Sequence, residues 1–202
     1  KCNGDPARRL GNEYLAQILM KENIETIAKY EVKKIVTTCP HCFNIFQNEY
    51  PQFGGMYEVI HHTEYIEQLL SSGKIQLTAS KNETITYHDS CYLVRYNGIA
   101  DAPRNALQSI AGISLVEMPR SKDKGFCCGA GGGRMFLEET VGKRVNIERT
   151  EEALSTNATT IASACPFCMT MMTDGVKEKA ATERVQVKDI AELVLEATNN
   201  IH

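Results

Sequence analysis

The chain has 202 residues, of which 43% are hydrophobic and 23% charged, enough for one large or two small globular domains. Its net charge of −3 provides no basic surface of the kind that binds nucleic acid, so we expect no nucleic-acid partner. No apolar run in the sequence approaches the roughly 20 residues that cross a bilayer.

The first part of the chain alternates helical patterns with short β-branched segments. In chain order it predicts one long helix or two over 5–30, a buried strand over 34–38, a helix after Pro40 that ends near Pro51, a strand over 57–61, and a helix capped by Thr63 that runs to Leu70. The short polar stretch 81–83 then predicts a boundary between two modules, 1–80 and 81–202.

The second part continues the alternation. It predicts strands over 84–88, 114–118, 159–164 and 185–187, and helices over 102–110, from Arg134 to about Ser155, after Pro166, and over 189–197. This order of strands and helices is typical of a parallel or mixed sheet covered by helices. We therefore expect an α/β fold made of two related modules.

The eight cysteines are grouped rather than scattered. Cys127 and Cys128 are adjacent; 35 residues separate Cys91 from the first of them, and 36 separate the second from the C-P-F-C pair of Cys165 and Cys168. Such pairs favour metal ligation, although redox-active dithiols and structural disulfides stay open. Five thiols are one more than a tetrahedral zinc ion uses, whereas an iron–sulfur cluster has several metal atoms to share among them.

Much of this arrangement occurs twice. An offset of 126 residues pairs Cys2 with Cys128, Cys39 with Cys165, and Cys42 with Cys168, and it also pairs identical residues at Arg8, Glu13, Glu25, Ile35 and Pro40. The chain is therefore a duplicated module. Lys1 stands where the second repeat has Cys127, and the counterpart of Cys91 would lie before residue 1. We expect a C-terminal fragment of a longer polypeptide.

The residues beside the cysteines suit a charged metal group. In each C-P-x-C pair, the first cysteine is expected to be the N-cap and proline the first helical residue, so that helix amides and the dipole favour thiolates. Gly129 and Gly131 would let the backbone approach inorganic sulfide, or would simply form a tight turn. His88, at a predicted strand end, is a candidate proton donor, or merely a hydrogen-bond partner of Asp89.

The pattern C-x35-C-C-G-x35-C-P-x-C, with His-Asp-x-Cys-Tyr-Leu-x-Arg-Tyr-Asn around its first cysteine, resembles the cysteine-rich CCG domain. That domain occurs in the B polypeptide of heterodisulfide reductase, in the iron–sulfur subunits of glycolate oxidase and anaerobic glycerol-3-phosphate dehydrogenase, and in lactate-utilisation proteins. The segments 2–13 and 127–135 are most similar to a membrane-associated branch of iron–sulfur oxidoreductases that passes electrons between electron-transfer flavoprotein and menaquinone.

The resemblance implies [4Fe–4S] clusters as cofactors. A noncubane cluster would be held by Cys91, Cys127, Cys128, Cys165 and Cys168, and an ordinary four-thiolate cluster by Cys2, Cys39 and Cys42 with an upstream cysteine. It further implies an oxidoreductase component that relays electrons between a flavoprotein and a quinone or membrane-bound acceptor. Its expected location is cytoplasmic, on the inner face of the membrane if a preceding N-terminal part anchors it.

Two other functions stay open. The chain could act as the disulfide-cleaving component of an enzyme of the heterodisulfide reductase type, with His88 supplying protons. In a different class, it could be a zinc-binding structural module in which the C-P-x-C pairs and a distant cysteine form closed sites.

Overall fold

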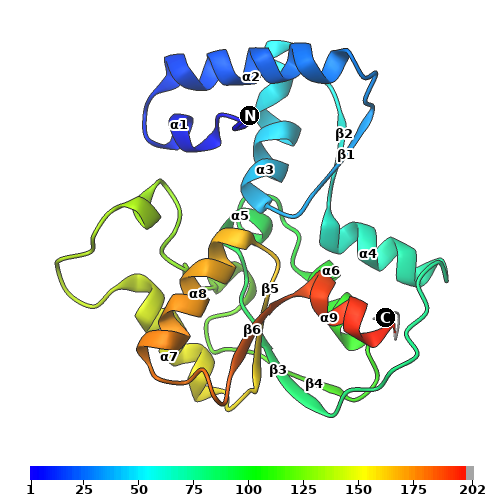
Figure 1. Cartoon of the computed structure of the whole chain (residues 1–202), viewed down its shortest axis with the longest axis vertical. Coiled ribbons are helices and arrows are strands. Elements are labelled where there is room, and N and C mark those ends of the chain that lie inside the picture. The colour runs from blue at the N-terminus through cyan, green and yellow to red at the C-terminus, as the bar shows by residue number, and fades with distance from the viewer. Residues whose placement is uncertain (199–202) are drawn as a thin grey trace.

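Two parallel sheets organise the chain in the computed structural model, which describes residues 1–198 (Figure 1). The first sheet pairs β1 (Lys34–Thr37) with β2 (Glu58–His61). The second has the order β4-β3-β5-β6 and comprises β3 (Glu83–Tyr87), β4 (Ile113–Val116), β5 (Thr160–Ser163) and β6 (Gln186–Asp189). Every neighbouring pair of strands is parallel, so the predicted α/β class is confirmed.

Helices lie around both sheets and form an upper and a lower lobe in Figure 1. The α-helices are α1 (Asp5–Arg9), α2 (Glu13–Ala28), α3 (Pro40–Asn44), α4 (His62–Ser71), α5 (Cys91–Val94), α6 (Asp101–Gln108), α7 (Val145–Ser155), α8 (Pro166–Glu178) and α9 (Ile190–Ala197). The region 5–30 forms two helices because Asn12 starts a new one, its side chain accepting a hydrogen bond from the Leu15 N–H at 3.1 Å. None of the helices within residues 1–198 is both long and apolar enough to cross a membrane.

The repeat seen in the sequence is also a repeat of structure. Strands β1 and β5 are offset by 126 residues, as are the prolines that begin α3 and α8. The offset grows to 128 for β2 and β6 and for the starts of α4 and α9. The second repeat therefore has two extra residues between the start of α8 and β6. The same strand–helix–strand–helix unit is therefore built twice.

The larger apolar core lies in the lower lobe, between the four-stranded sheet and the helices α6 and α9. Helix α4 contributes to it, because Ile66 and Leu70 pack against this core although they precede residue 81. The smaller core of the upper lobe is formed mainly by α2 and the segment after α3, with Met20, Ile45 and Tyr50 fully buried. The modules 1–80 and 81–202 stay a prediction, and α4, which contacts β1 and β2, packs on the core of the lower lobe.

Three local predictions were wrong. Strand β1 is not buried, since its sheet has only two strands and Val36 keeps 45% of its surface exposed. The helix expected from Arg134 begins at Val145 instead, because Glu139 accepts the Val145 N–H and the preceding residues form only a short 3₁₀ turn. Helix α4 is capped by His61 rather than by Thr63; the His61 ring accepts the Thr63 N–H.

Candidate metal centre

The two C-P-x-C pairs lie at the carboxyl ends of β1 and β5. Cys39 is the N-cap of α3 and Cys165 the N-cap of α8, and each is followed by proline at the first helical position, as predicted. Both cysteines have extended backbones and buried side chains. Each strand leads directly into its cysteine pair, and the proline that follows the first cysteine begins the helix. The four thiols of these pairs therefore lie at helix N-termini, where negative charge is favoured.

Seven cysteine side chains form a continuous series of sulfur neighbours that crosses from one lobe to the other. In order they are Cys91, Cys127, Cys128, Cys168, Cys165, Cys39 and Cys42, each close enough to the next to shift its pKa. The Sγ atoms of Cys128 and Cys168 lie 3.3 Å apart, and all eight cysteines are free thiols. The structure thus brings together the five cysteines predicted from the second repeat, and Cys39 adjoins them through Cys165.

The eighth cysteine stands apart from this series. Cys2 is exposed and lines an open cavity of about 320 Å³ together with Cys42. The intervening Asn3 donates a hydrogen bond from Nδ2 to the Cys42 sulfur at 3.0 Å. Of the three cysteines predicted from the first repeat, Cys39 and Cys42 belong to the sulfur series. Cys2 lies on the solvent side of the cavity that it shares with Cys42.

The crowded sulfurs suit a multivalent metal group. The adjacent sulfurs of Cys128 and Cys165, together with complete burial, raise the pKa of Cys168 well above its usual range. Cys127 and burial likewise raise the pKa of Cys91, and Cys127 is the main cause that raises the pKa of Cys128 to about 12. Thiolates so close together need metal ions to offset their mutual repulsion, and metal binding would release these protons. The donor set of unpaired sulfurs, some buried and some half-buried, fits an iron–sulfur group.

Gly129 and Gly131 occupy different surroundings. The Gly129 N–H donates to the Cys127 sulfur at 3.3 Å, and its φ of 91° lies in the region that favours glycine. A side chain there would also meet the Val145 Cβ at 3.1 Å. A Cβ at Gly131 would meet nothing within 4 Å. The predicted role of backbone amides beside sulfur therefore has a structural basis at Gly129 that Gly131 does not share.

His88 lies against the sulfurs at the end of β3. One of its ring nitrogens is within 4.8 Å of the sulfurs of both Cys128 and Cys168, and the side chain is fully buried. Its Nδ1 accepts a hydrogen bond from Arg149 Nε at 2.9 Å. Burial, with the neighbouring Arg149 charge, lowers the pKa of His88 to about 3. The alternative that His88 only bonds Asp89 was wrong.

Asp89 is instead held by a buried arginine. Arg104 donates NH1 and NH2 to the two carboxylate oxygens of Asp89, each at 2.9 Å, and also binds Glu117. This bidentate pair fixes the loop that joins β3 to α5, and Cys91 is the first residue of α5. Arg104 and Asp89 thus hold the loop before Cys91 in place and do not themselves contact the sulfurs through these hydrogen bonds.

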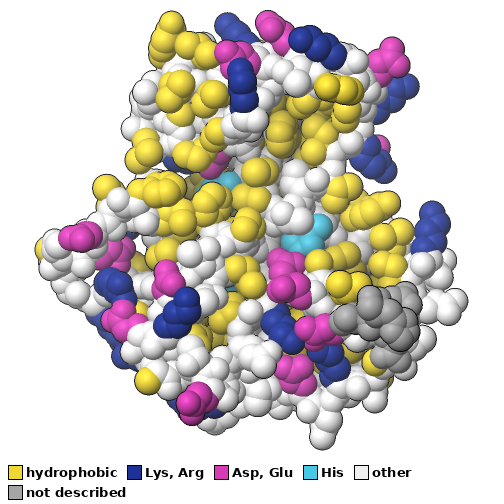
Figure 2. Space-filling model, viewed as in Figure 1, with side chains coloured by type: hydrophobic (Ala, Val, Ile, Leu, Met, Phe, Trp, Pro, Cys, Tyr) yellow, Lys and Arg dark blue, Asp and Glu magenta, His cyan; other side chains and the backbone are white. Residues whose placement is uncertain are grey.

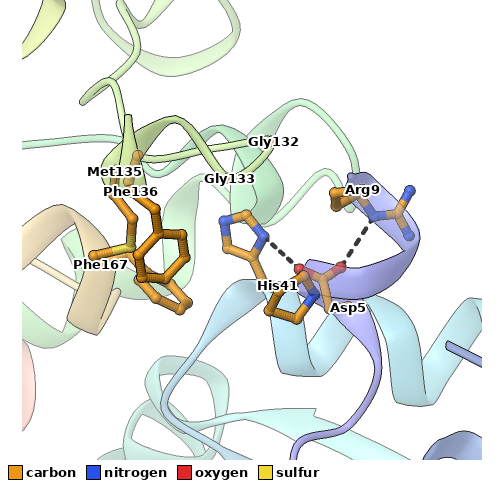
Figure 3. A pocket seen from close by; sticks show the side chains of 10 residues that line it. Asp5, Arg9, His41, Gly132, Gly133, Met135, Phe136 and Phe167 are labelled. Atoms are coloured by element: carbon orange, nitrogen blue, oxygen red, sulfur yellow. Dashed lines mark hydrogen bonds and ion pairs between the residues drawn. The ribbon is translucent and has the colours of Figure 1, made fainter. Parts of the chain in front are cut away.

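A second histidine, which the sequence did not single out, lies at the junction of the lobes. This histidine is His41, which lies inside the first C-P-x-C pair. Its Nδ1 lies 3.2 Å from one carboxylate oxygen of Asp5, and Arg9 Nε binds the other oxygen at 3.0 Å (Figure 3). The ring stacks on Tyr92 at 4.0 Å and meets the edge of Phe167 at 5.5 Å between centroids. The 126-residue offset pairs His41 with Phe167, which is the one sequence signal that relates them.

Cavities open on both sides of this histidine. A small one, of about 20 Å³, is lined by residues of both lobes: Asp5, Pro6, Arg9, His41, Ala130, Gly132, Gly133, Met135, Phe136 and Phe167. The other is the open cavity that Cys2 and Cys42 line. In Figure 2, hydrophobic side chains gather on the viewed face where the two lobes meet, with histidine visible among them. Solvent therefore reaches the neighbourhood of the sulfurs at the lobe junction.

Sequence reasoning also missed Arg149, a fully buried arginine of α7. Besides His88, it binds the Arg120 carbonyl and the Glu152 carboxylate, each at 2.9 Å. The repeat pairs position 149 with Asn23, so no identity in the two repeats marks it. An arginine in a polar-looking helix carries no sequence signal for such burial.

Comparison with known proteins finds one matching family. The family model described as "Cysteine-rich domain", CCG, matches residues 1–47 and 85–173. The probable iron–sulfur-binding oxidoreductase FadF of Bacillus subtilis is 51% identical over 197 residues, and EtfAB:quinone oxidoreductase of Syntrophomonas wolfei is 48% identical over 203 residues. The matches cover 98% and 97% of this chain and 28% of each relative.

A third relative is named for a different activity. It is the D polypeptide of dihydromethanophenazine:CoB–CoM heterodisulfide reductase from Methanosarcina barkeri, 38% identical over 202 residues, which are 97% of this chain and 49% of that polypeptide. The chain thus spans less than half the length of each of these three curated relatives.

Proposed function

The chain belongs to the cysteine-rich CCG domain family, and on that premise we propose that it is the iron–sulfur electron-transfer part of an oxidoreductase. Membership confirms the resemblance found in the sequence. The relatives are named as oxidoreductases or as components of them, which is the class that the sequence predicted. The observation that carries the proposal is the series of seven neighbouring, unpaired sulfurs, four of them buried, across two helix N-termini.

The proposed cofactors are [4Fe–4S] clusters. We assign Cys91, Cys127, Cys128, Cys165 and Cys168 to a cluster of the noncubane type, because five thiols exceed the need of a four-thiolate cluster. Cys39 and Cys42, with Cys2 and a further ligand, would hold a second cluster. When bound, such a group accepts and releases single electrons.

The protein's own residues would bind and insulate this centre. Helix N-termini at Cys39 and Cys165 direct positive dipole ends toward the thiolates, and the Gly129 amide donates to a sulfur. Cys165 and Cys168 are buried, which keeps water from the inner side of the centre. Cys39 and Cys165 are neighbours, which supports a relay between the two proposed clusters.

The proposed partners are a flavoprotein electron donor and a quinone or membrane-bound acceptor. The support is the name of the relative EtfAB:quinone oxidoreductase, which this chain matches at 48% identity. A quinone acceptor lies in a membrane, so we propose that the chain works at the cytoplasmic face of one.

Metal analysis of anaerobically purified protein tests the cofactor proposal. We expect iron and acid-labile sulfide in several-fold molar excess over protein. Stoichiometric zinc without sulfide would support the structural zinc module instead. Cys127→Ser should alter the EPR spectrum of a five-thiolate cluster, whereas a zinc site with four other thiols should tolerate it. Cys2→Ser is the matched comparison: it should alter only the signal of the second cluster, of which Cys2 is a proposed ligand, and leave the signal of the five-thiolate cluster unchanged.

Rapid mixing with a reduced electron-transfer flavoprotein tests the relay. Bleaching of cluster absorbance within the mixing experiment would support it. Iron–sulfur-loaded protein that the flavoprotein does not reduce would exclude this donor.

Disulfide cleavage is the second candidate, favoured by the open cavity that reaches Cys42 and by the heterodisulfide reductase relative. Cleavage would consume two electrons and two protons per disulfide and yield two thiols, with the flavoprotein supplying the electrons. Thiol release from a small-molecule disulfide, in proportion to the electrons supplied, would support this function. Full reduction of the protein without thiol release would leave the relay alone.

A further inference from the structure

The nitrogen atoms of His88 have unequal partners. Nδ1 accepts from Arg149, whereas Nε2 is buried and has no hydrogen-bond partner within residues 1–198. A His88 ring nitrogen lies within 4.8 Å of the Cys128 and Cys168 sulfurs. Since Nδ1 is engaged by Arg149, Nε2 is the atom that is available to this sulfur pair.

The Arg149 contact decides where the imidazole proton lies. A guanidinium group stays charged in proteins and can only donate hydrogen bonds, so Nδ1 of His88 must present its lone pair to Arg149. The single proton of a neutral imidazole must then be on Nε2. His88 therefore offers an N–H, and not a lone pair, to the sulfurs.

This arrangement is the reverse of that at a metal-ligating histidine. A ligating imidazole binds the metal through one nitrogen and donates its other N–H to a carboxylate, carbonyl or water. Here the second nitrogen of His88 accepts from a cation instead. His88 is thus unsuited to complete a zinc site with Cys128 and Cys168, and suited to donate to sulfur.

Arg149 is itself fixed from two sides. Its NH1 donates to Glu152 Oε2 of the same helix and to the Arg120 carbonyl, each at 2.9 Å. Arg120 also binds the Glu152 carboxylate, which connects the two residues that accept from Arg149 NH1. With its side chain fully buried, Arg149 has little freedom to turn its Nε away from His88.

We propose that Arg149 is a positioning residue that holds His88 as an N–H donor to the sulfur of Cys128 or Cys168 and thereby raises the reduction potential of the metal centre. Hydrogen bonds to cluster sulfurs stabilise the more negative, reduced state. In this role His88 keeps its proton, which replaces the proton-donor role considered from the sequence. The inference rests on the proposed function, because it requires an iron–sulfur group at these sulfurs.

Potentiometric titration of iron–sulfur-loaded protein, followed by EPR, tests the effect on potential. His88→Leu should bind as much iron as the wild type but reduce less readily. We expect about a tenfold fall in the reduction equilibrium constant, which is 59 mV for one electron. His88→Gln, which retains an amide N–H, should recover part of the loss. Arg184→Gln is the matched control, because it removes an exposed arginine that lies outside this network.

Nitrogen NMR of the same protein, labelled in its histidines, tests the positioning. The wild type should show His88 protonated at Nε2, and Arg149→Met should show protonation at both positions in exchange. Loss of iron from His88→Leu would overturn the inference, since it would make His88 a ligand. An unchanged potential in His88→Leu, or an Nδ1 proton in the wild type, would also overturn it. Wild-type protein without iron and sulfide would instead refute the proposed function, while the NMR would still report the Arg149 contact.

Discussion

Gly129 and Gly131 are two residues apart, and only Gly129 is required by the backbone. We expect Gly129→Ala to lower the free energy of unfolding by about 1–3 kcal/mol, because alanine is strained at φ 91° and would crowd Val145. The same change should weaken iron retention, since it displaces the amide that donates to Cys127. Denaturant unfolding and iron analysis measure the two effects.

Gly131→Ala is the control for that experiment. Its added methyl group meets no atom within 4 Å, so stability should change by no more than about 0.5 kcal/mol. Equal losses in the two variants would show that the whole glycine run, rather than the Gly129 amide, is needed.

His61 makes stability depend on pH. Burial and the neighbouring His62 lower the pKa of His61 to about 3, so the folded protein holds it neutral while the unfolded chain protonates it below about 6.5. Its contribution is therefore complete above pH 6.5 and is lost as the pH falls toward 3. For this one group we expect a loss of about 1.4 kcal/mol between pH 7.5 and 5.5.

His61→Asn isolates this contribution. Asparagine is a good N-cap and can replace the acceptor that the His61 ring offers to the Thr63 N–H, but it does not titrate. Urea unfolding at both pH values should therefore show a smaller acid loss in the variant. A variant that loses as much stability as the wild type would assign the acid sensitivity to other groups.

At the scale of elements, α7 and α8 pack more closely than ordinary side chains allow. A Cβ on Gly175 would lie 2.0 Å from Thr150 Oγ1 and 2.9 Å from its Cβ. We expect Gly175→Ala to force the helices apart and to lower stability by about 1–3 kcal/mol, the usual cost of overpacking. Because α8 begins at the Cys165 cap and α7 carries Arg149, the EPR spectrum should change as well.

Lys177→Ala is a suitable control for Gly175→Ala. Lys177 is exposed on the same helix, so its truncation should leave both stability and spectrum almost unchanged. Thermal unfolding of the loaded variants compares them. If Gly175→Ala matches the control, the two helices can separate without disturbing the centre.

The elements show what local patterns can predict. The positions of strands β1 and β5 and of the C-P-x-C caps that follow them were predicted correctly. The β-branched residues, the proline and the repeat all indicate the same point at which strand gives way to helix. The start of α7 was not predicted, because it depends on a side-chain contact across six residues, Glu139 with the Val145 N–H, that helical periodicity does not reveal. Likewise, β1 is exposed because only one strand joins it, which its own residues do not reveal.

The candidate site divides in the same way. Cysteine spacing predicted which sulfurs converge, because ligand type and repeat are written in the sequence. The hydrogen-bonding residues behind the sulfurs were missed, since Arg149 reaches His88 from 61 positions away. Such contacts depend on how α7 packs on the sheet, and a single sequence does not give that packing.

At the scale of the whole molecule, equivalent positions of the two repeats meet. Cys39 neighbours Cys165, and His41 meets Phe167, each pair being related by the offset of 126. This is the arrangement expected when two copies of a module pack face to face through the same surface. The helix N-termini of α3 and α8 thus converge where the lobes join (Figure 1). A duplication followed by such packing would place two thiol-rich sites beside one another.

Tyr92 joins the lobes at this point, because its ring lies between His41 at 4.0 Å and Tyr96 at 4.4 Å. We expect Tyr92→Leu to lower stability by about 1–2 kcal/mol and to let the upper lobe unfold first, since the variant lacks the only aromatic surface on which His41 stacks in parallel within residues 1–198. Hydrogen exchange of α2 compared with β3 measures this separation. Tyr96→Leu is the control, because Tyr96 is 64% exposed and lies on the far side of Tyr92. If α2 and β3 still exchange together in Tyr92→Leu, the lobes are held by α4 and not by this stack.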